Sequence, residues 1–378
     1  MSLPKRYLCF ALLLCSHMPL RAATFVPGED PPYAAALLLE ADTGTVLFEY
    51  RAHQRRSPAS TQKILLQLVV MDMVAAGKFS LDEEVRVSAR ASRVGGSQVF
   101  LAQDEVFPLR QLMETIAIPS ANDACVAVAE HIGGSVEGFV HMMNQRAAAL
   151  GLENTRCVNV HGLDDTPKDQ GNYSTAHDLA QISLALLDYP EILEWSSIRY
   201  KPFRQGKFML YTTNKLLGKF RGLDGLKTGH TKRAGSCLVA TAKRSEMRLI
   251  SAILGAPSEK KRANETRRLL SWGFNNFTKT PLVEAGEHMG TVALDWGLEP
   301  EVAVQTQDTV IAVLSPLQKN QLVRQVDLPA QFPAPVEEGQ GVGKLKISLG
   351  DSLLTEVDLV VTRSVDRMTL WEKFTSYF

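Results

Sequence analysis

Three short motifs hold residue types that can together break an amide bond. The first is S-T-Q-K at residues 60–63, the second is S-A-N at 120–122 and the third is K-T-G at 227–229. Each motif is common by itself, since S-x-x-K occurs again at Ser258 and Lys261. Their order along the chain, and the elements expected to carry them, make the combination specific for nucleophilic catalysis.

Ser60 and Lys63 have the spacing of a nucleophile and its base. Side chains three residues apart on a helix share one face, with Cβ atoms about 5 to 6 Å apart, so the lysine amine can reach the serine hydroxyl. A serine hydroxyl becomes an effective nucleophile when a base takes its proton. Lysine can act as that base when burial or a second cation lowers its pKa, and Lys227 is the candidate cation.

The same motifs supply groups for the transition state. The backbone N–H of Ser60 is unpaired at a helix start and can face an oxyanion, and His230 can donate a second N–H from a strand edge. Ser120 and Asn122 are expected to relay the proton and to hold the substrate amide.

Hydrophobic periodicity shows which elements must position these motifs. Residues 34–50 predict a β-hairpin around the turn A-D-T-G, and residues 60–76 predict a long buried helix. Further helices are predicted at 109–118, 122–131, 136–150, 176–187 and 264–274, and further strands at 236–241 and 247–254. Strands at both ends with helices between them predict one sheet, assembled from both ends of this region and covered by a helical layer.

The last hundred residues change character. Residues 278–286 are expected to be a linker, followed by a small all-β module. Its strands are predicted at 291–294, 302–304, 310–314, 322–326, 344–349 and 357–361, and the stretch 329–343 is rich in Pro and Gly.

Composition limits the function classes. The chain has 378 residues, 41 basic and 41 acidic side chains and no net charge, which gives no support to nucleic acid as a partner. Residues 1–22 have the layout of a secretory signal peptide, with Lys5 and Arg6 before a short apolar run, so export is expected. Removal of the leader leaves three cysteines, Cys125, Cys157 and Cys237, which permit at most one disulfide.

Several strings are similar to those of the low-molecular-mass penicillin-binding proteins, specifically D-alanyl-D-alanine carboxypeptidases with an added C-terminal β domain. The similarity begins near residue 32 and is strongest in A-D-T-G (41–44), P-A-S (58–60), S-A-N-D-A-C (120–125), H-G-L-D (161–164), Y-S-T-A (173–176) and D-G-L-K-T-G-H-T (224–231). Ala121 and Gln62 depart from residues usual in the family, at variable positions of the motifs.

The resemblance implies an α+β fold. A β-lactamase/transpeptidase-like domain, with an antiparallel sheet and a helical layer, would precede a small all-β domain and a C-terminal amphipathic helix. The expected ranges are a signal peptide at 1–22, a catalytic domain at 23–280, a β-rich domain at 286–362 and a membrane-anchoring helix at 363–378.

The resemblance also implies roles for single residues. Ser60 would be the acylated nucleophile and Lys63 its base, with Ser120, Asn122 and Lys227 as the remaining catalytic groups. The substrate-binding residues would be Lys227, Thr228, Gly229, His230 and Arg262. Thr228 and Arg262 would bind the terminal carboxylate, because the arginine fork matches a carboxylate bidentately. No metal or cofactor is expected.

The implied partners are peptidoglycan pentapeptides that end in D-Ala-D-Ala, β-lactam antibiotics and a membrane surface. A class A β-lactamase is the nearest enzyme alternative, but it uses S-D-N and an additional glutamate. Here Ala121 stands in the second motif, and residues 161–178 contain no Glu. A peptidoglycan endopeptidase, or a catalytically silent penicillin-binding scaffold, remains a further alternative.

The tail at 363–378 carries a helical stripe of bulky apolar residues. Val365, Met368, Trp371, Phe374 and Phe378 follow one another at spacings of three or four, with basic residues off that face. Sixteen helical residues span only about 24 Å and cannot cross a bilayer. An interfacial helix on the outer face of the cytoplasmic membrane is expected, with a helix docked on the β module as the alternative.

Overall fold

The computed structural model describes Phe25 and residues 31–375. These residues form two compact units that divide between Asn275 and Asn276. The division lies a few residues before the expected domain end at 280. The expected leader at 1–22 lies outside the described residues.

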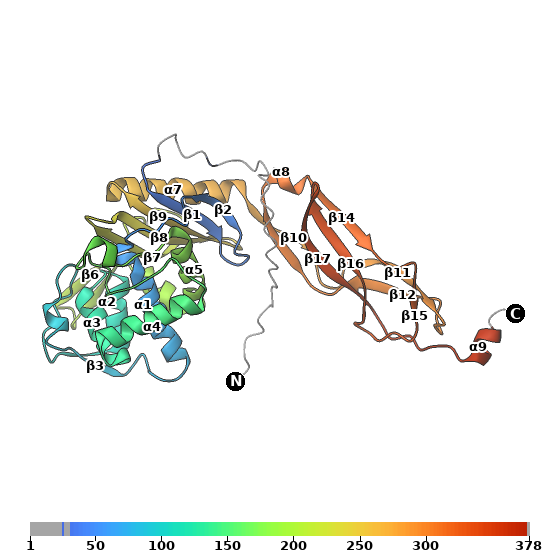
Figure 1. Cartoon of the computed structure of the whole chain (residues 1–378), viewed down its shortest axis with the longest axis horizontal. Coiled ribbons are helices and arrows are strands. Elements are labelled where there is room, and N and C mark those ends of the chain that lie inside the picture. The colour runs from blue at the N-terminus through green and yellow to red at the C-terminus, as the bar shows by residue number, and fades with distance from the viewer. Residues whose placement is uncertain (1–24, 26–30, 376–378) are drawn as a thin grey trace. The chain divides into compact units, whose positions relative to one another are not determined.

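A five-stranded antiparallel sheet is the centre of the first unit (Figure 1). Its strands are β1 (Ala35–Glu40), β2 (Val46–Tyr50), β7 (Leu223–Thr231), β8 (Gly235–Arg244) and β9 (Met247–Ala256), in the order β2-β1-β9-β8-β7. β1 is buried throughout, which explains its nearly continuous apolar sequence. The predicted hairpin and the predicted single sheet from both ends of the region are confirmed.

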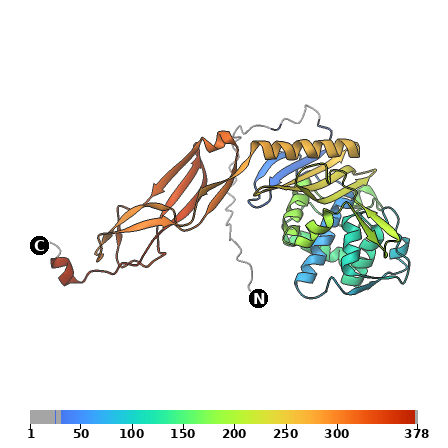
Figure 2. The ribbon, with the colours of Figure 1, turned by 180° about the vertical axis from the view of Figure 1, so that it is seen from behind.

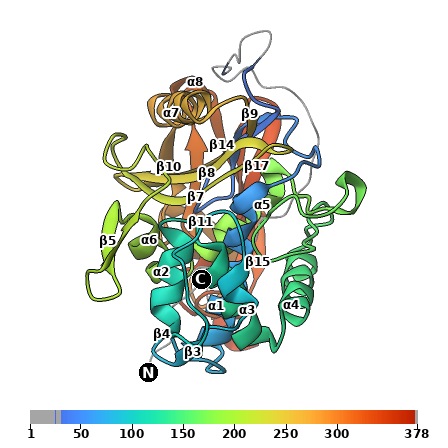
Figure 3. The ribbon, with the colours of Figure 1, turned by 90° about the vertical axis from the view of Figure 1, so that its left-hand side faces the viewer.

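Helices cover both faces of this sheet, as Figures 1 and 3 show. One side carries α1 (Lys63–Ala75), α2 (Leu109–Ala117), α3 (Asn122–Gly133), α4 (Val136–Ala149), α5 (Ala176–Leu186) and α6 (Pro190–Ser196). The other side carries α7 (Glu259–Asn276), seen along the sheet in Figure 2. α7 packs closely because Gly273 has no side chain: a Cβ there would lie 2.7 Å from Leu249 and 2.8 Å from Leu38.

Two predicted helices differ in their start. Residues 60–62 belong to a 3-10 turn, η1 (Ala59–Gln62), and the α-helix begins at Lys63. The predicted helix at 264–274 is longer, since α7 already begins at Glu259. The Ser258 hydroxyl accepts a hydrogen bond from the Lys261 N–H there, which makes this second S-x-x-K pattern part of a helix start.

Short elements not predicted from the sequence surround the helical layer. They are β3 (Glu84–Arg86), η2 (Ala91–Arg93), β4 (Val106–Pro108), η3 (Lys168–Gln170), β5 (Tyr200–Phe203) and β6 (Phe208–Tyr211). β3 pairs with β4, and β5 pairs with β6 as a hairpin. Their short length explains why periodicity did not reveal them.

The second unit is an all-β module. A six-stranded sheet has the order β14-β16-β17-β12-β11-β15, and a two-stranded sheet pairs β10 with β13. The strands are β10 (Thr278–Val283), β11 (His288–Asp295), β12 (Glu301–Thr306), β13 (Val310–Leu314), β14 (Leu322–Asp327), β15 (Gln331–Pro333), β16 (Gly341–Leu349) and β17 (Ser352–Val361), with the short helix α8 (Pro316–Lys319) before β14. Leu282 and Leu314 of the small sheet share one apolar core with Val304, Leu345 and Leu359 of the large sheet.

The linker predicted at 278–286 is wrong for its first six residues. They form β10, which pairs with β13 over a register that includes Pro281 opposite Ile311. Proline lacks an N–H and suits an edge strand, and both strands of a two-stranded sheet are edges.

The predicted helix at 363–378 is also wrong over its first half. α9 begins only at Leu370 and extends to Thr375, and residues 376–378 lie outside the described residues. Val365 is 3% exposed, forms a bridge with Val336 and belongs to the core of the β module. Its apolar side chain therefore fills a domain interior and is not part of a membrane-facing stripe.

No helix among the described residues has both the length and the apolar character needed to cross a membrane. The thiols of Cys125, Cys157 and Cys237 are free and buried, so the disulfide that the sequence permitted is not formed in this structure.

Candidate active site

The start of η1 lies against the edge strand β7, where the first and third motifs meet. Gly229 makes this approach possible, because a Cβ on it would lie 2.9 Å from the backbone nitrogens of both Ser60 and Thr61. On the other side, Gly162 packs against the Ala59 backbone with a positive φ of 84°. Ala59 itself has a φ of 48°, an unusual value for a residue with a side chain.

Ser60 is half-buried at this junction, and its hydroxyl donates to the carbonyl oxygen of His161 at 3.3 Å. Lys63, one helical turn on, is fully buried. Its Nζ donates to the carbonyl and the hydroxyl oxygen of Ser120, at 2.6 and 3.0 Å, and to Oδ1 of Asn122 at 2.5 Å. The lysine thus joins the first motif to the second.

The second motif has a fixed backbone. Ser120 adopts a positive φ of 72°, and after Ala121 the helix α3 begins at Asn122. Asn122 donates from its backbone N to Ser97 O at 2.7 Å, and from Nδ2 to Gly95 O at 2.8 Å. The loop at residues 95–101 therefore sets which way the Asn122 amide points.

Burial perturbs both lysines of the site. It lowers the pKa of Lys63 below its usual value, and for Lys63 burial is the largest cause. The pKa of Lys227, which is 1% exposed, lies well below its usual value because burial and the neighbouring Lys63 charge both disfavour a further cation. For Lys63, burial favours the neutral state that a general base requires, whereas the charge of Lys227, the candidate cation, is not among the causes that lower its pKa.

The residues expected to bind a carboxylate lie near the C-terminal end of β7. Thr228 shares a 2.6 Å hydrogen bond with Thr213, and Lys227 Nζ donates to Thr228 O at 3.0 Å. Arg262, on α7, is 3% exposed; its Nη1 donates to Cys237 O at 3.4 Å. Its Nε is buried and has no hydrogen-bond partner among the described residues.

His230 follows these residues on β7, and its side chain is exposed. Its Nδ1 lies 3.3 Å from Ser236 Oγ. The sequence predicted a role only for its backbone.

His161 and Thr213 are neighbours of the site that the sequence did not assign. Burial, followed by the Lys63 charge, lowers the pKa of His161 to about 4, so its ring is neutral at pH 7. The string H-G-L-D was visible, but the group that meets Ser60 is the His161 carbonyl, and a backbone atom leaves no residue-type signal. Asp164 in that string accepts from Ser57 Oγ at 3.1 Å and from Arg233 N at 3.2 Å.

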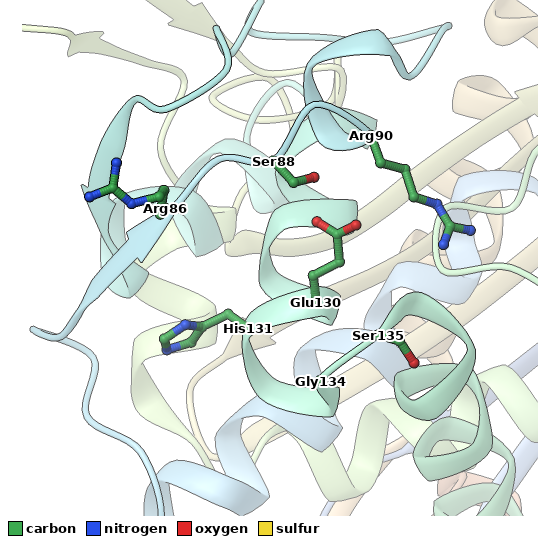
Figure 4. A pocket seen from close by; sticks show the side chains of 7 residues that line it. All are labelled: Arg86, Ser88, Arg90, Glu130, His131, Gly134 and Ser135. Carbon is green, nitrogen blue, oxygen red and sulfur yellow. The ribbon is translucent and has the colours of Figure 1, made fainter.

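A separate hollow of about 360 Å³ lies beside the end of α3 and the start of α4 (Figure 4). It is lined by Arg86, Ser88, Arg90, Glu130, His131, Gly134 and Ser135. Arg90 pairs with Glu137 at 2.8 Å and His131 with Glu83 at 2.5 Å, so charged groups of its lining already have protein partners. None of the three motifs lines it.

The fold and the gathered motifs are those of a serine hydrolase, with a serine and a buried lysine at a helix start beside a sheet edge. A family model described as D-alanyl-D-alanine carboxypeptidase matches residues 29–258, and one described as penicillin-binding protein 5, C-terminal domain, matches residues 277–367. The chain belongs to the D-alanyl-D-alanine carboxypeptidase family and is a hydrolase of that class. The resemblance found in the sequence is confirmed.

Similar proteins span nearly the whole chain. D-alanyl-D-alanine carboxypeptidase DacA of Escherichia coli is 32% identical over 381 residues, covering 98% of this chain and 93% of its own. DacF of Bacillus subtilis is 34% identical over 326 residues, covering 85% and 83%. The crystal structure of penicillin-binding protein 5 from Haemophilus influenzae matches with a TM-score of 0.75 and 30% identity, over 93% of this chain and all of that one.

Proposed function

We propose that the enzyme removes the terminal D-alanine from peptidoglycan pentapeptides through an acyl-enzyme on Ser60. The observation that carries this proposal is the contact of buried Lys63 with both Ser120 and Asn122, three residues along the chain from the half-buried Ser60. The curated relatives named above are D-alanyl-D-alanine carboxypeptidases, which supports the choice of substrate.

Acylation begins with proton transfer. Neutral Lys63 accepts the Ser60 proton after the hydroxyl rotates away from His161 O, and Oγ bonds to the carbonyl carbon of the penultimate residue. The carbonyl electron pair moves to oxygen, facing the backbone N–H groups of Ser60 and His230. Ser120, 3.0 Å from Lys63 Nζ, relays the proton to the leaving amine as the C–N bond breaks.

Deacylation reverses these roles. Water replaces the departed D-alanine, gives a proton to the same relay and attacks the ester carbonyl, which releases the shortened peptide and restores the Ser60 hydroxyl. Asn122 contributes by holding Lys63, and Lys227 by donating from its Nζ to Thr228 O beside the site.

Substrate recognition rests on Thr228, Gly229 and Arg262 in this proposal. Gly229 lets the β7 backbone approach Ser60, so that the strand edge can bind the substrate backbone there, Thr228 donates from its hydroxyl, and the Arg262 guanidinium attracts the terminal carboxylate. A free carboxylate is what distinguishes a chain end from an internal peptide bond.

The proposal is tested by mass spectrometry. A β-lactam should add its full mass to the protein, and digestion should place the adduct on the peptide that contains Ser60. A relative, penicillin-binding protein D2 of Listeria monocytogenes, has a structure in its ampicillin-bound form; it matches with a TM-score of 0.60 and 32% identity over 66% of this chain. An adduct that persists in Ser60→Ala, or no release of D-alanine from a D-Ala-D-Ala pentapeptide, contradicts the proposal.

We infer further that the enzyme is exported, with a leader at 1–22, and lies on the outer face of the cytoplasmic membrane. Its catalytic domain would end near 275, its β module near 367, and its anchor would begin at α9. Leu370, Trp371 and Phe374 of α9 are 79%, 75% and 62% exposed, a bulky apolar surface for lipid.

Liposome sedimentation tests the anchor. Because Val365 belongs to the β-module core, truncation is placed after Met368, which keeps this residue. The full mature chain should sediment with anionic liposomes, and the truncated chain should stay in solution with unchanged hydrolysis of a soluble peptide. Equal sedimentation of both excludes α9 as the anchor.

A further inference from the structure

The aspartate that follows the second motif has no role assigned by the proposed mechanism. Asp123 is 1% exposed, yet its hydrogen bonds among the described residues do not go to a basic side chain. Instead its carboxylate accepts from three backbone N–H groups, those of Val99, Leu101 and Ala124. The distances range from 3.0 to 3.3 Å.

Two of these N–H groups belong to the loop at residues 95–101, which is the loop that holds Asn122. Gly95 O accepts from Asn122 Nδ2 at 2.8 Å, and Ser97 O accepts from Asn122 N at 2.7 Å. Gly96 lies so close that a Cβ on it would come within 2.6 Å of Asn122 Nδ2. The hydrogen bonds from Asp123 to Val99 and Leu101 therefore fix the same loop that holds the Asn122 side chain.

The orientation of the Asn122 amide matters because its two ends face different partners. Nδ2 points to the loop, which leaves Oδ1 to accept from Lys63 Nζ at 2.5 Å. If the loop moved, the amide would lose the bond that fixes Nδ2, and Lys63 would lose an oriented acceptor. We propose that Asp123 is a positioning residue, which fixes the loop at 95–101 and through it the Asn122 amide that aligns Lys63 with Ser60.

Arg204 holds the same loop from outside. Its guanidinium donates to Val99 O and to Phe100 O at 2.7 Å each, and pairs with Glu105 at 2.7 Å. This contact comes from the turn between β5 and β6 and is far along the chain from α3. The loop is thus held both by a buried anion and by a cation, and of the two only the anion changes the pKa of Lys63 by its charge.

The coupling to Lys63 gives a measurement that a purely structural role would not change. The charged and titratable groups that face Lys63 are Asp123 and Cys125 from α3, Lys227 from β7 and His161 from its loop. The Asp123 charge raises the pKa of Lys63, opposing the effect of burial. Removal of that charge lowers the pKa of Lys63 further. The acylation rate falls at acid pH as Lys63 takes up a proton, and this part of the pH profile, the acid limb, moves to lower pH.

The test compares Asp123→Asn with wild type, since this change keeps the shape and removes the charge. Acylation by a fluorescent penicillin is followed against pH and divided by the titrated number of active sites. The rate above the limb should fall about tenfold or more, because misplacement of catalytic groups by fractions of an ångström is costly. The limb itself should move to lower pH.

Two control variants separate the causes. Asp104→Asn makes the same chemical change at an exposed position. Asp104 has a φ of 68°, which asparagine also tolerates, so this variant should alter neither the rate nor the limb. Arg204→Gln loosens the loop without changing the charge near Lys63, and should lower the rate while the limb stays in place. An Asp123→Asn enzyme with the wild-type rate and limb overturns the proposal.

A measurement on the unaltered protein covers the case in which the variant does not fold. The amides of Val99 and Leu101 should exchange slowly with solvent deuterium, compared with the exposed amides of the same loop. Rapid exchange at both positions also overturns the proposal. The inference rests on the proposed function, and the two fail differently: wild-type protein that is not acylated on Ser60 refutes the function, whereas normal acylation without an Asp123 effect refutes only the inference.

Discussion

Gly229→Ala tests the idea that the absence of a side chain on β7 lets the strand approach the nucleophile. The added methyl carbon would lie 2.9 Å from Ser60 N and Thr61 N and 3.1 Å from the Ala59 side chain. Ordinary contact begins at 3.4 Å, so the gap must open by 3.4 minus 2.9, or about 0.5 Å. The atoms in the way belong to the backbone of η1, and β7 is held by its pairing with β8, so neither side yields easily.

Overpacking of this kind costs about 1–3 kcal/mol of folding stability. A shift of about 0.5 Å between Ser60 N and the β7 edge also separates the two N–H groups of the oxyanion site, which should lower the acylation rate about tenfold or more. The rate is measured with a fluorescent penicillin and the stability by thermal unfolding.

The control is Gly341→Ala in the β module, where a Cβ meets nothing within 4 Å. It should leave both the acylation rate and the unfolding of the catalytic domain unchanged. A Gly229→Ala enzyme that is acylated at the wild-type rate, with wild-type stability, would refute the close approach of β7 and η1 as a requirement.

Three further predictions concern single side chains. Lys63→Arg keeps a cation that cannot lose its proton, so acylation should fall about 100-fold or more while circular dichroism is unchanged; near-normal acylation removes Lys63 from the base role. Arg262→Ala should slow hydrolysis of a free-carboxylate peptide about tenfold or more and that of its C-terminal amide much less; equal losses indicate a structural role. The pKa of His161 is lowered from 6.5 to about 4 in the folded protein. Between these pH values the His161 ring binds a proton in the unfolded chain but not in the folded one. The folding stability should therefore fall by up to about 3 kcal/mol as the pH drops from about 6.5 to about 4. In chemical unfolding, His161→Asn should flatten that loss, and an unchanged slope contradicts the buried neutral ring.

The inner strands of the central sheet, β1, β8 and β9, were predictable because burial on both faces leaves a continuous apolar run. β10 was not, because Pro281 and its polar neighbours are typical of a linker, and only pairing with β13 reveals the strand. The tail failed for a related reason. An apolar residue at position 365 fits the helical stripe, but it fits a bridge to Val336 equally well. Tertiary packing decides between the two, and the sequence pattern does not show it.

In the active site, the residue types were predictable and the supporting backbone was not. Lys63 meets Ser120 and Asn122, which lie 57 and 59 residues further along the chain, so the first two motifs come together in the folded protein. The His161 carbonyl and the N–H groups of Val99 and Leu101 are present in every peptide unit, so no sequence pattern marks them. Contacts made by backbone atoms depend on the folded path of the loops.

The central sheet also has a consequence for how the protein is made. β1 lies between β2 and β9 in the sheet, and Ala35 of β1 is opposite Leu254 of β9. During synthesis β1 therefore lacks its β9 neighbour until more than two hundred further residues have been made. Until then its apolar segment needs protection from other unfinished chains, since an unpaired apolar strand is prone to aggregate. A nascent chain that stops before β9 cannot form this pairing, and the catalytic domain is expected to complete its folding late, as one cooperative unit.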